Sequence, residues 1–298
     1  MREAGTLVIL FGSDQSSLRN EADLLISTGL PPGTAPSVTV NKQAEPICPS
    51  GPVGNLTAMW TFTGELVAAC TRRGKMPTMY RAALEPGAQD RNQRYAAYAF
   101  HEDIKIDPVP SGQLGQAYLT EIRRCLHNIR DHQIPALQEG ARKMAGVIKA
   151  GHKSWVLVLG HNLPYQLGLS GDPGLLDASL FFKLLNLPPA EMPDQILATI
   201  GPVDGLVYVG GYAFPDFGWD ERLYNMGVPF VLVTGGRETN PVTPGPEEIH
   251  IDPYWEHGDA CVEIPGYDIK ILPPSGVIQT AALWMISGEI AGHMASDR

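Results

Sequence analysis

The chain has 298 residues, of which 44% are hydrophobic and 18% charged, and its formal net charge is −10. This composition is too apolar for a disordered chain, and no apolar run reaches the roughly 18 residues of a membrane span. An acidic chain without a long basic cluster is a poor partner for nucleic acid, because that binding depends on neutralising phosphates. We therefore expect a globular protein that binds neither nucleic acid nor a membrane.

The spacing of the cysteines and the absence of common glycine motifs exclude further classes of protein. Four cysteines stand far apart without C-x-x-C spacing, and the N-terminus lacks the pattern of a secretory signal peptide. Reduced thiols are typical of the cytoplasm, so we expect a cytoplasmic protein. There is no G-x-G-x-x-G sequence, P-loop or G-x-S-x-G elbow. The sequence thus predicts no cofactor and no metal, and it disfavours a serine hydrolase of the usual α/β type.

The predicted elements alternate between strands and helices. Apolar runs that end in glycine predict strands at 6–11, 155–159, 206–209 and 229–233. Such Val- and Leu-rich runs without alternation are typical of strands buried on both faces of a parallel sheet. Between them, 116–149 carries two helical stripes, and Pro135 lies either at a break between two helices or in the first turn of the second.

The segment 107–113 has the Pro and Gly content of a linker. It predicts a boundary between an N-terminal α/β lobe, residues 1–112, and a second domain, residues 113–298. Each part also contains a Pro-Ser-Gly turn followed by a helix with Trp and Gly-Glu at matching spacing. The matching residues are Ser50, Trp60 and Gly64-Glu65 in the first copy, and Ser275, Trp284 and Gly288-Glu289 in the second. These similarities suggest a duplicated strand, loop and helix unit, although a match this short can also arise by chance.

The second domain resembles the sugar isomerase (SIS) domain, a phosphosugar-binding α/β fold, as found in uncharacterised bacterial proteins related to phosphoheptose isomerases. The order of segments carries the resemblance: Tyr118–Arg123, Ala145–Trp155, Val156–Asn162, Gly258–Gly266 and Pro273–Gly276. It implies a three-layer fold with a five-stranded parallel sheet between helices, the N-terminal lobe being an additional, partial repeat. It also implies a homodimer or higher homo-oligomer, and a ligand at the carboxyl ends of the strands.

The loops that would bind phosphate in a SIS domain are altered. The first reads Gly160-His161-Asn162-Leu-Pro-Tyr165-Gln166 and the second Gly210-Gly211-Tyr212, so both lack the hydroxyl clamp that the resemblance implies. Backbone amides can still hold an anion there, and an unphosphorylated sugar becomes more credible. The better hydroxyl-rich loop follows the first strand. The ligand-binding candidates are Gly160, Asn162, Tyr165, Gln166, Gly211, Tyr212, Ser275, Ser13, Ser16 and Ser50.

Three catalytic candidates stand out. An aldose-ketose isomerase needs a base that moves a proton between adjacent carbons, commonly Glu, and a group that opens the ring. Glu256 lies beside Tyr254 and Trp255, which can stack on a sugar, and His257 follows it. His161 follows a predicted buried strand and titrates near neutrality. The same cluster around Glu256 also fits a capped surface loop or, without any metal-binding signature, a metal site.

The sequence therefore predicts a sugar or phosphosugar binding protein, which the resemblance extends to an isomerase acting by proton transfer. Two alternatives stay open. One is a non-catalytic sugar-phosphate sensor that keeps the pocket without the base. The other is a structural or assembly subunit, which the replaced hydroxyl loops and the acidic composition favour.

Overall fold

The computed structural model describes residues 5–31, 36–40, 45–83, 85–159, 167–168, 170–210, 219–235, 248–256 and 258–296. The strands are β1 (Ile9–Gly12), β2 (Leu24–Ser27), β3 (Pro36–Val38), β4 (Ile47–Pro49), β5 (Ser154–Leu159), β6 (Gly205–Gly210), β7 (Phe230–Val233) and β8 (Glu248–Ile251). The α-helices are α1 (Gly51–Thr71), α2 (Ala88–Tyr95), α3 (Gln113–His132), α4 (Ile134–Lys149), α5 (Ser179–Leu184), α6 (Met192–Thr199), α7 (Trp219–Asn225) and α8 (Ser275–Ala295). Two short 3-10 helices, η2 (Arg19–Glu21) and η3 (Pro189–Glu191), complete the described elements.

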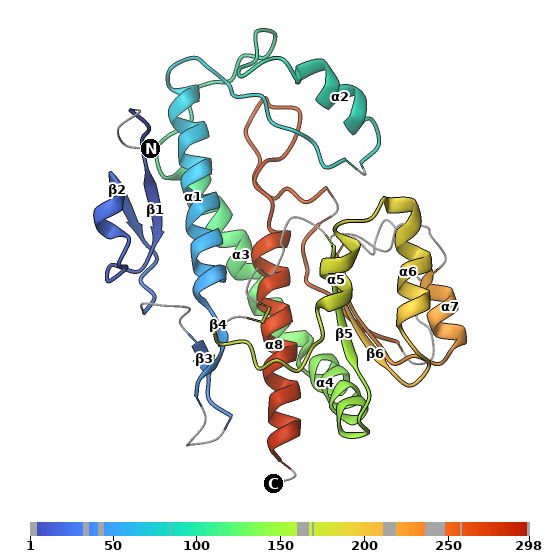
Figure 1. Cartoon of the computed structure of the whole chain (residues 1–298). Helices are drawn as coiled ribbons and strands as arrows, with labels where there is room; N and C mark the ends of the chain where they lie inside the picture. Colours follow the sequence, from blue (N-terminus) through green and yellow to red (C-terminus); the bar gives the residue numbers. More distant parts are fainter. Residues whose placement is uncertain are drawn as a thin grey trace.

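The main sheet is parallel, with strand order β5-β6-β7-β8 (Figure 1). A Cβ on Gly140 of α4 would lie 2.9 Å from Val231 of β7, whereas the neighbouring Phe230 ring packs against Tyr224 of α7 with centroids 5.6 Å apart. Because successive side chains of a strand point to opposite faces, α4 and α7 cover opposite faces of the sheet. The predicted three-layer α/β fold is thus confirmed. Within the described residues the sheet has four strands, where the resemblance implied five.

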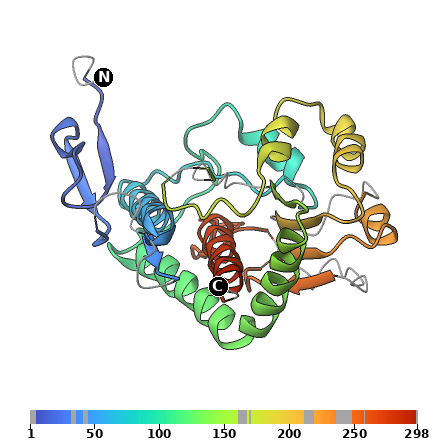
Figure 2. The same cartoon turned by 60° about the horizontal axis from the view of Figure 1, so that its bottom comes forward.

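The predicted break at Pro135 is confirmed. Gln133 ends α3 and precedes α4, and Pro135 occupies the first turn of α4, where its missing N–H costs no helical hydrogen bond. The two helices meet at this break in an open V, in which α3 packs on α1 and α4 packs on α8 (Figure 2). Their buried stripes include Tyr118 and Met144, as the spacing predicted.

The N-terminal region consists of the parallel pair β1-β2, the antiparallel pair β3-β4 and the long helix α1. Helix α1 packs against β1, α3 and α8. One cluster of buried apolar side chains contains Val67 of α1, Tyr118 of α3, Ile278 of α8 and Val207 of β6. The regions on either side of residue 112 therefore share a core, and the domain boundary stays a prediction. Among the described residues, no helix combines the length and apolar character that crossing a membrane requires.

The two repeated segments form helices α1 and α8, each of 21 residues. When the helices are aligned at their first residues, Trp60 of α1 matches Trp284 of α8. In this register the residue before α1, Ser50, matches Pro274 rather than Ser275. The pairing of Ser50 with Ser275 that the sequence suggested is therefore wrong by one residue, because Pro274 stands at the position of Ser50.

The same register pairs the loops that lead into the two helices. Cys48, three residues before α1, has φ +61°, and Leu272, three residues before α8, has φ +65°. A Cβ on Gly64 of α1 would lie 2.9 Å from Leu272, and one on Gly288 of α8 would lie 3.3 Å from Cys48. Each loop thus packs on the glycine of the other helix. This reciprocal arrangement supports a duplicated unit.

Candidate functional site

Most of the predicted site residues fall outside the described residues. These are Gly160, His161, Asn162, Tyr165, Gln166, Gly211, Tyr212 and His257. The roles predicted for them stay predictions. The structure does place Glu256 and the four predicted serines, and it divides them among three surroundings.

Ser275 is fully buried at the start of α8. Its hydroxyl donates to Asp259 Oδ2 at 2.7 Å, and its backbone N–H donates to Asp259 Oδ1 at 3.0 Å. The Asp259 carboxylate therefore already occupies the N-terminus of α8, where the free N–H groups and the helix dipole favour a negative charge. Ser275 supports this internal cap, and its predicted contact with a ligand stays a prediction.

Ser13 and Ser16 lie in the loop after β1, at the carboxyl end of the parallel pair β1-β2. They line a cavity of about 520 Å³, which we name the strand-end cavity. Its walls come from the ends of both strands and from the first turns of α1. The lining residues are Leu10, Phe11, Gly12, Ser13, Gln15, Ser16, Ser17, Leu18, Thr28, Leu30, Pro31, Gly51 and Asn55.

Close packing holds α1 against this cavity. Gly54 lies so near the end of β2 that an added Cβ would come within 3.7 Å of Thr28 and still closer to Leu30. Only glycine permits this approach, because any side chain would displace Leu30. The first turn of α1 is thereby fixed beside the loop that carries the serines. Ser50 itself is the N-cap residue, and its side chain makes no capping hydrogen bond to α1.

The serine hydroxyls of the strand-end cavity are arranged as donors. Ser13 Oγ accepts the N–H of Gln15 at 3.2 Å, and Ser16 Oγ accepts the N–H of Leu18 at 3.3 Å. An oxygen that accepts in this way still has its own hydrogen to donate. Thr28 Oγ1 is buried and has no hydrogen-bond partner. Asp14, whose charge would repel an anion, does not line the cavity, and neither does any other carboxylate of the described residues.

Glu256 lies elsewhere, and it lines a separate cavity together with Trp60 of α1, Glu85 and the segments 79–83, 258–260 and 268–273. Its carboxylate accepts a hydrogen bond from Lys270 Nζ at 2.7 Å, and this bond lowers the pKa of Glu256 below its usual 4.5. A lowered pKa makes a carboxylate a weaker base. The predicted role of Glu256 as the base of an isomerase stays a prediction.

The sequence contained a signal for the strand-end cavity in the Ser-rich loop after the first strand. For Asn55 the sequence offered a position near a predicted helix start, where it could cap the helix or contact an anion. It contained no signal for Thr28, because the place of Thr28 beside the loop depends on the pairing of β2 with β1. Within the described residues, no three His, Cys, Asp or Glu side chains gather in a way that would hold a metal ion.

Comparison with known proteins adds little to this geometry. No protein-family model matches the chain, and no curated protein matches it. Among solved structures, the chain is similar to the C-terminal domain of glucosamine-fructose-6-phosphate aminotransferase from Francisella tularensis, with 13% sequence identity and a TM-score of 0.39. The match covers 96% of this chain and 61% of that chain, so this chain spans less than two thirds of the matched structure. A score this low does not establish a shared fold, and the fold therefore rests on the strand order and helix packing.

Proposed function

We propose that the protein binds a phosphorylated sugar, with the phosphate group in the strand-end cavity. The observation that carries the proposal is the set of hydroxyl residues Ser13, Ser16 and Thr28 that line a cavity without any carboxylate among its described lining residues. A phosphate ester is an acceptor with several oxygens, so it matches a surface that offers donors without competing negative charge.

The start of α1 adds a second attraction for an anion. Gly51 and Asn55 of its first turns line the cavity, and the first turn of α1 contains no acidic side chain. Backbone N–H groups and the helix dipole at such a position stabilise a negative charge. A ligand oxygen near Thr28 would also satisfy a hydroxyl whose buried, unpaired state costs on the order of 1–3 kcal/mol.

The size and the remaining lining residues favour a ligand larger than phosphate alone. The cavity volume of about 520 Å³ lies within the range of small-molecule sites. The side-chain amides of Gln15 and Asn55 offer both donors and acceptors, which suits sugar hydroxyls. The resemblance to SIS domains supplies the sugar as the carrier of the phosphate.

The proposal is one of binding without isomerisation. Glu256, the first choice for the base, lines a different cavity and is paired with Lys270. The strand-end cavity has no lining carboxylate or histidine among the described residues, so none of these residues offers it a proton acceptor of the kind that an enediol route needs. In deuterated water, we expect no solvent deuterium to enter the carbon skeleton of fructose 6-phosphate or glucose 6-phosphate. Incorporation would contradict this part of the proposal.

Calorimetric titration with fructose 6-phosphate and with inorganic phosphate tests the binding. We expect the sugar phosphate to bind the native protein more tightly than phosphate, and the double variant S13A/S16A to lose at least tenfold in affinity for both. The matched control is S296A, because Ser296 is an exposed serine that follows α8. Equal affinity in S13A/S16A and S296A, or no binding of either probe to the native protein, would overturn the proposal.

A further inference from the structure

The cavity that contains Glu256 has a volume of about 620 Å³. Trp60 of α1 lies on it, and we name it the tryptophan cavity. It is lined by Trp60, Met79, Tyr80, Arg81, Ala82, Ala83, Glu85, Glu256, Gly258, Asp259, Ala260, Asp268, Ile269, Lys270, Ile271, Leu272 and Pro273. The strand-end cavity shares none of these residues.

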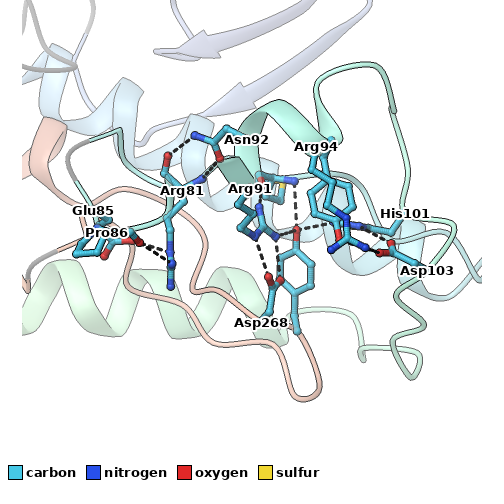
Figure 3. A network of polar contacts seen from close by, with 12 residues as sticks. Arg81, Glu85, Pro86, Arg91, Asn92, Arg94, His101, Asp103 and Asp268 are labelled. Atoms are coloured by element: carbon cyan, nitrogen blue, oxygen red, sulfur yellow. Dashed lines mark hydrogen bonds and ion pairs between the residues drawn. The ribbon is translucent and has the colours of Figure 1, made fainter. Parts of the chain in front are cut away.

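Polar contacts from α2 hold one wall of this cavity in place (Figure 3). The guanidinium of Arg91 donates to both carboxylate oxygens of Asp268, each at 2.8 Å, and to the carbonyl oxygen of Met79 at 2.6 Å. The side chain of Asn92 bonds to both the N–H and the C=O of Arg81, at 2.9 and 2.8 Å. Two segments distant in sequence are thus clamped to α2, so the space between them is preformed.

Two further lining segments, around Asp259 and Leu272, contain backbone in unfavourable conformations. Asp259 has φ +44° and Leu272 has φ +65°, values that non-glycine residues seldom adopt. Gly258 has φ +99°, and a Cβ added to Gly258 would clash with the carboxylate of Glu85. Such residues persist only where the surroundings hold them, and they cluster at ligand sites. In this molecule the Leu272 loop also packs on Gly64 and Asp259 also caps α8, so these residues are held in place from the side away from the cavity as well.

The charges of the cavity select against an anion. Four carboxylates line it, those of Glu85, Glu256, Asp259 and Asp268, against the two cations Arg81 and Lys270. Both cations are already paired, since Arg81 Nε lies 2.9 Å from Glu85 and Lys270 Nζ lies 2.7 Å from Glu256. A phosphate group would meet a surplus of negative charge here, in contrast to the strand-end cavity.

We propose that the tryptophan cavity is a second small-molecule site, which binds an uncharged polyhydroxylated ring such as a monosaccharide. Trp60 offers an apolar face for the C–H side of the ring, next to the apolar side chains of Met79 and Ile271. The paired charges on the rim supply donors and acceptors for hydroxyl groups without requiring a charged ligand. This site goes beyond the proposed phosphosugar site, and neither depends on the other.

A comparison of the two repeated helices also distinguishes Trp60 from its counterpart Trp284. Trp284, at the matching position of α8, is only 5% exposed and is part of the core. Trp60 is only half-buried and faces the cavity. The two copies of the unit thus share an indole at the same helical position, and only the copy on α1 is open to a ligand.

Titration with D-glucose, D-fructose and glucose 6-phosphate, followed by tryptophan fluorescence and calorimetry, tests the proposal. We expect at least one neutral hexose to bind, W60A to weaken that binding at least tenfold, and W60F to retain most of it, because a phenyl ring still offers a stacking face. K270M, which removes a hydroxyl partner from a partly exposed position, should weaken binding several-fold while the protein stays folded.

The control variant S13A/S16A separates this site from the phosphosugar site, and it should bind the neutral hexose as the native protein does. The proposal is overturned if neither hexose binds, or if W60A and K270M both bind the hexose with native affinity. It is also overturned if W60A abolishes the binding of glucose 6-phosphate, since that would place the charged ligand in this cavity.

Discussion

Helices α1 and α8 have equal length, follow loops of the same unusual conformation and pack on each other's loops, yet their N-termini face different surroundings. At α8, the buried carboxylate of Asp259 accepts hydrogen bonds from Ser275. At α1, the first turn lines a cavity with hydroxyl groups and no described carboxylate. The same scaffold thus uses one helix N-terminus for internal packing, whereas the other faces a cavity.

The largest effect is expected from removing the internal anion. Asp259→Ala leaves the buried N–H and hydroxyl of Ser275 without their acceptor, which should lower the free energy of unfolding by about 2–3 kcal/mol. Urea denaturation measures this loss. The matched variant near α1 is Asp14→Ala. Asp14 is exposed and lies outside the strand-end cavity, so its replacement should lower the free energy of unfolding by less than about 0.5 kcal/mol. An equal loss of stability in Asp259→Ala and Asp14→Ala would show that the Asp259 carboxylate does not stabilise the start of α8.

Gly64 and Gly288, each of which packs on the loop before the other helix, allow the packing of α1 and α8 to be compared directly. In Gly64→Ala the new methyl group would meet Leu272 at 2.9 Å, so overpacking should outweigh the gain in helix propensity, for a net loss of about 1 kcal/mol. In Gly288→Ala the nearest atom is Cys48 Sγ at 3.3 Å, and the stability should be unchanged or raised by about 0.5 kcal/mol. Urea denaturation of both variants in parallel tests the order, and a larger loss in Gly288→Ala would contradict it.

The pairing of Arg91 with Asp268 at the tryptophan cavity should make the stability of the protein depend on pH. The hydrogen bond from Arg91 lowers the pKa of Asp268 below its usual 3.8, so this pair stabilises the folded state above that pH, and the stabilisation is lost as the pH falls through the lowered pKa. The stability difference between the native protein and Asp268→Asn should be constant from pH 7 to 5 and shrink below about pH 4. Urea denaturation across this range measures it.

The control for the acid response is Asp131→Asn. Asp131 also pairs with an arginine, Arg130, but both side chains are largely exposed, so their pairing should add little to stability at any pH. If Asp131→Asn and Asp268→Asn show the same pH dependence, the contact between α2 and the wall of the tryptophan cavity contributes no more than a surface pair.

The smallest effect concerns the loop before α1. Burial raises the pKa of the Cys48 thiol to about 11, so at pH 7 almost none of it is the reactive thiolate. We expect a thiol reagent such as DTNB to leave Cys48 unmodified in the native protein and to modify it once urea unfolds the chain. Mass spectrometry of the labelled peptide identifies the site. Rapid labelling of Cys48 in the native protein would show that its contact with Gly288 opens readily.

How much was predictable from the sequence differs between the helices and the sites. The break at Pro135 follows from the chemistry of one residue, and the buried strands β5, β6 and β7 follow from uninterrupted apolar runs, so these could be predicted locally. The run at 6–11 was expected to be buried as well, but β1 lies in the separate pair β1-β2 and is mostly half-buried. The register of the repeat could not, because the Pro-Ser-Gly motif lies one residue closer to the tryptophan in the second copy, while the tryptophans and glycines keep their spacing. Only the positions of the helix starts show which match is structural.

The sites depended on contacts between distant segments. The sequence singled out Ser275 and Ser13 alike, since each hydroxyl lies near a turn at the edge of an element. Packing separated them, because the chain brings Asp259 to Ser275 and brings Thr28 and Asn55 to the loop of Ser13. Likewise, nothing near Glu256 in the sequence indicated Lys270, whose hydrogen bond lowers its pKa.

The sequence by itself indicated the layered α/β architecture and the break between α3 and α4, and it suggested a repeated unit, because apolar periodicity, proline and glycine act over a few neighbouring residues. Only the tertiary structure decided which helix N-terminus meets a carboxylate and which meets a cavity, and which of the two repeated tryptophans is buried. Those outcomes depend on distances between groups far apart along the chain, and such distances are set when the helices and strands pack together.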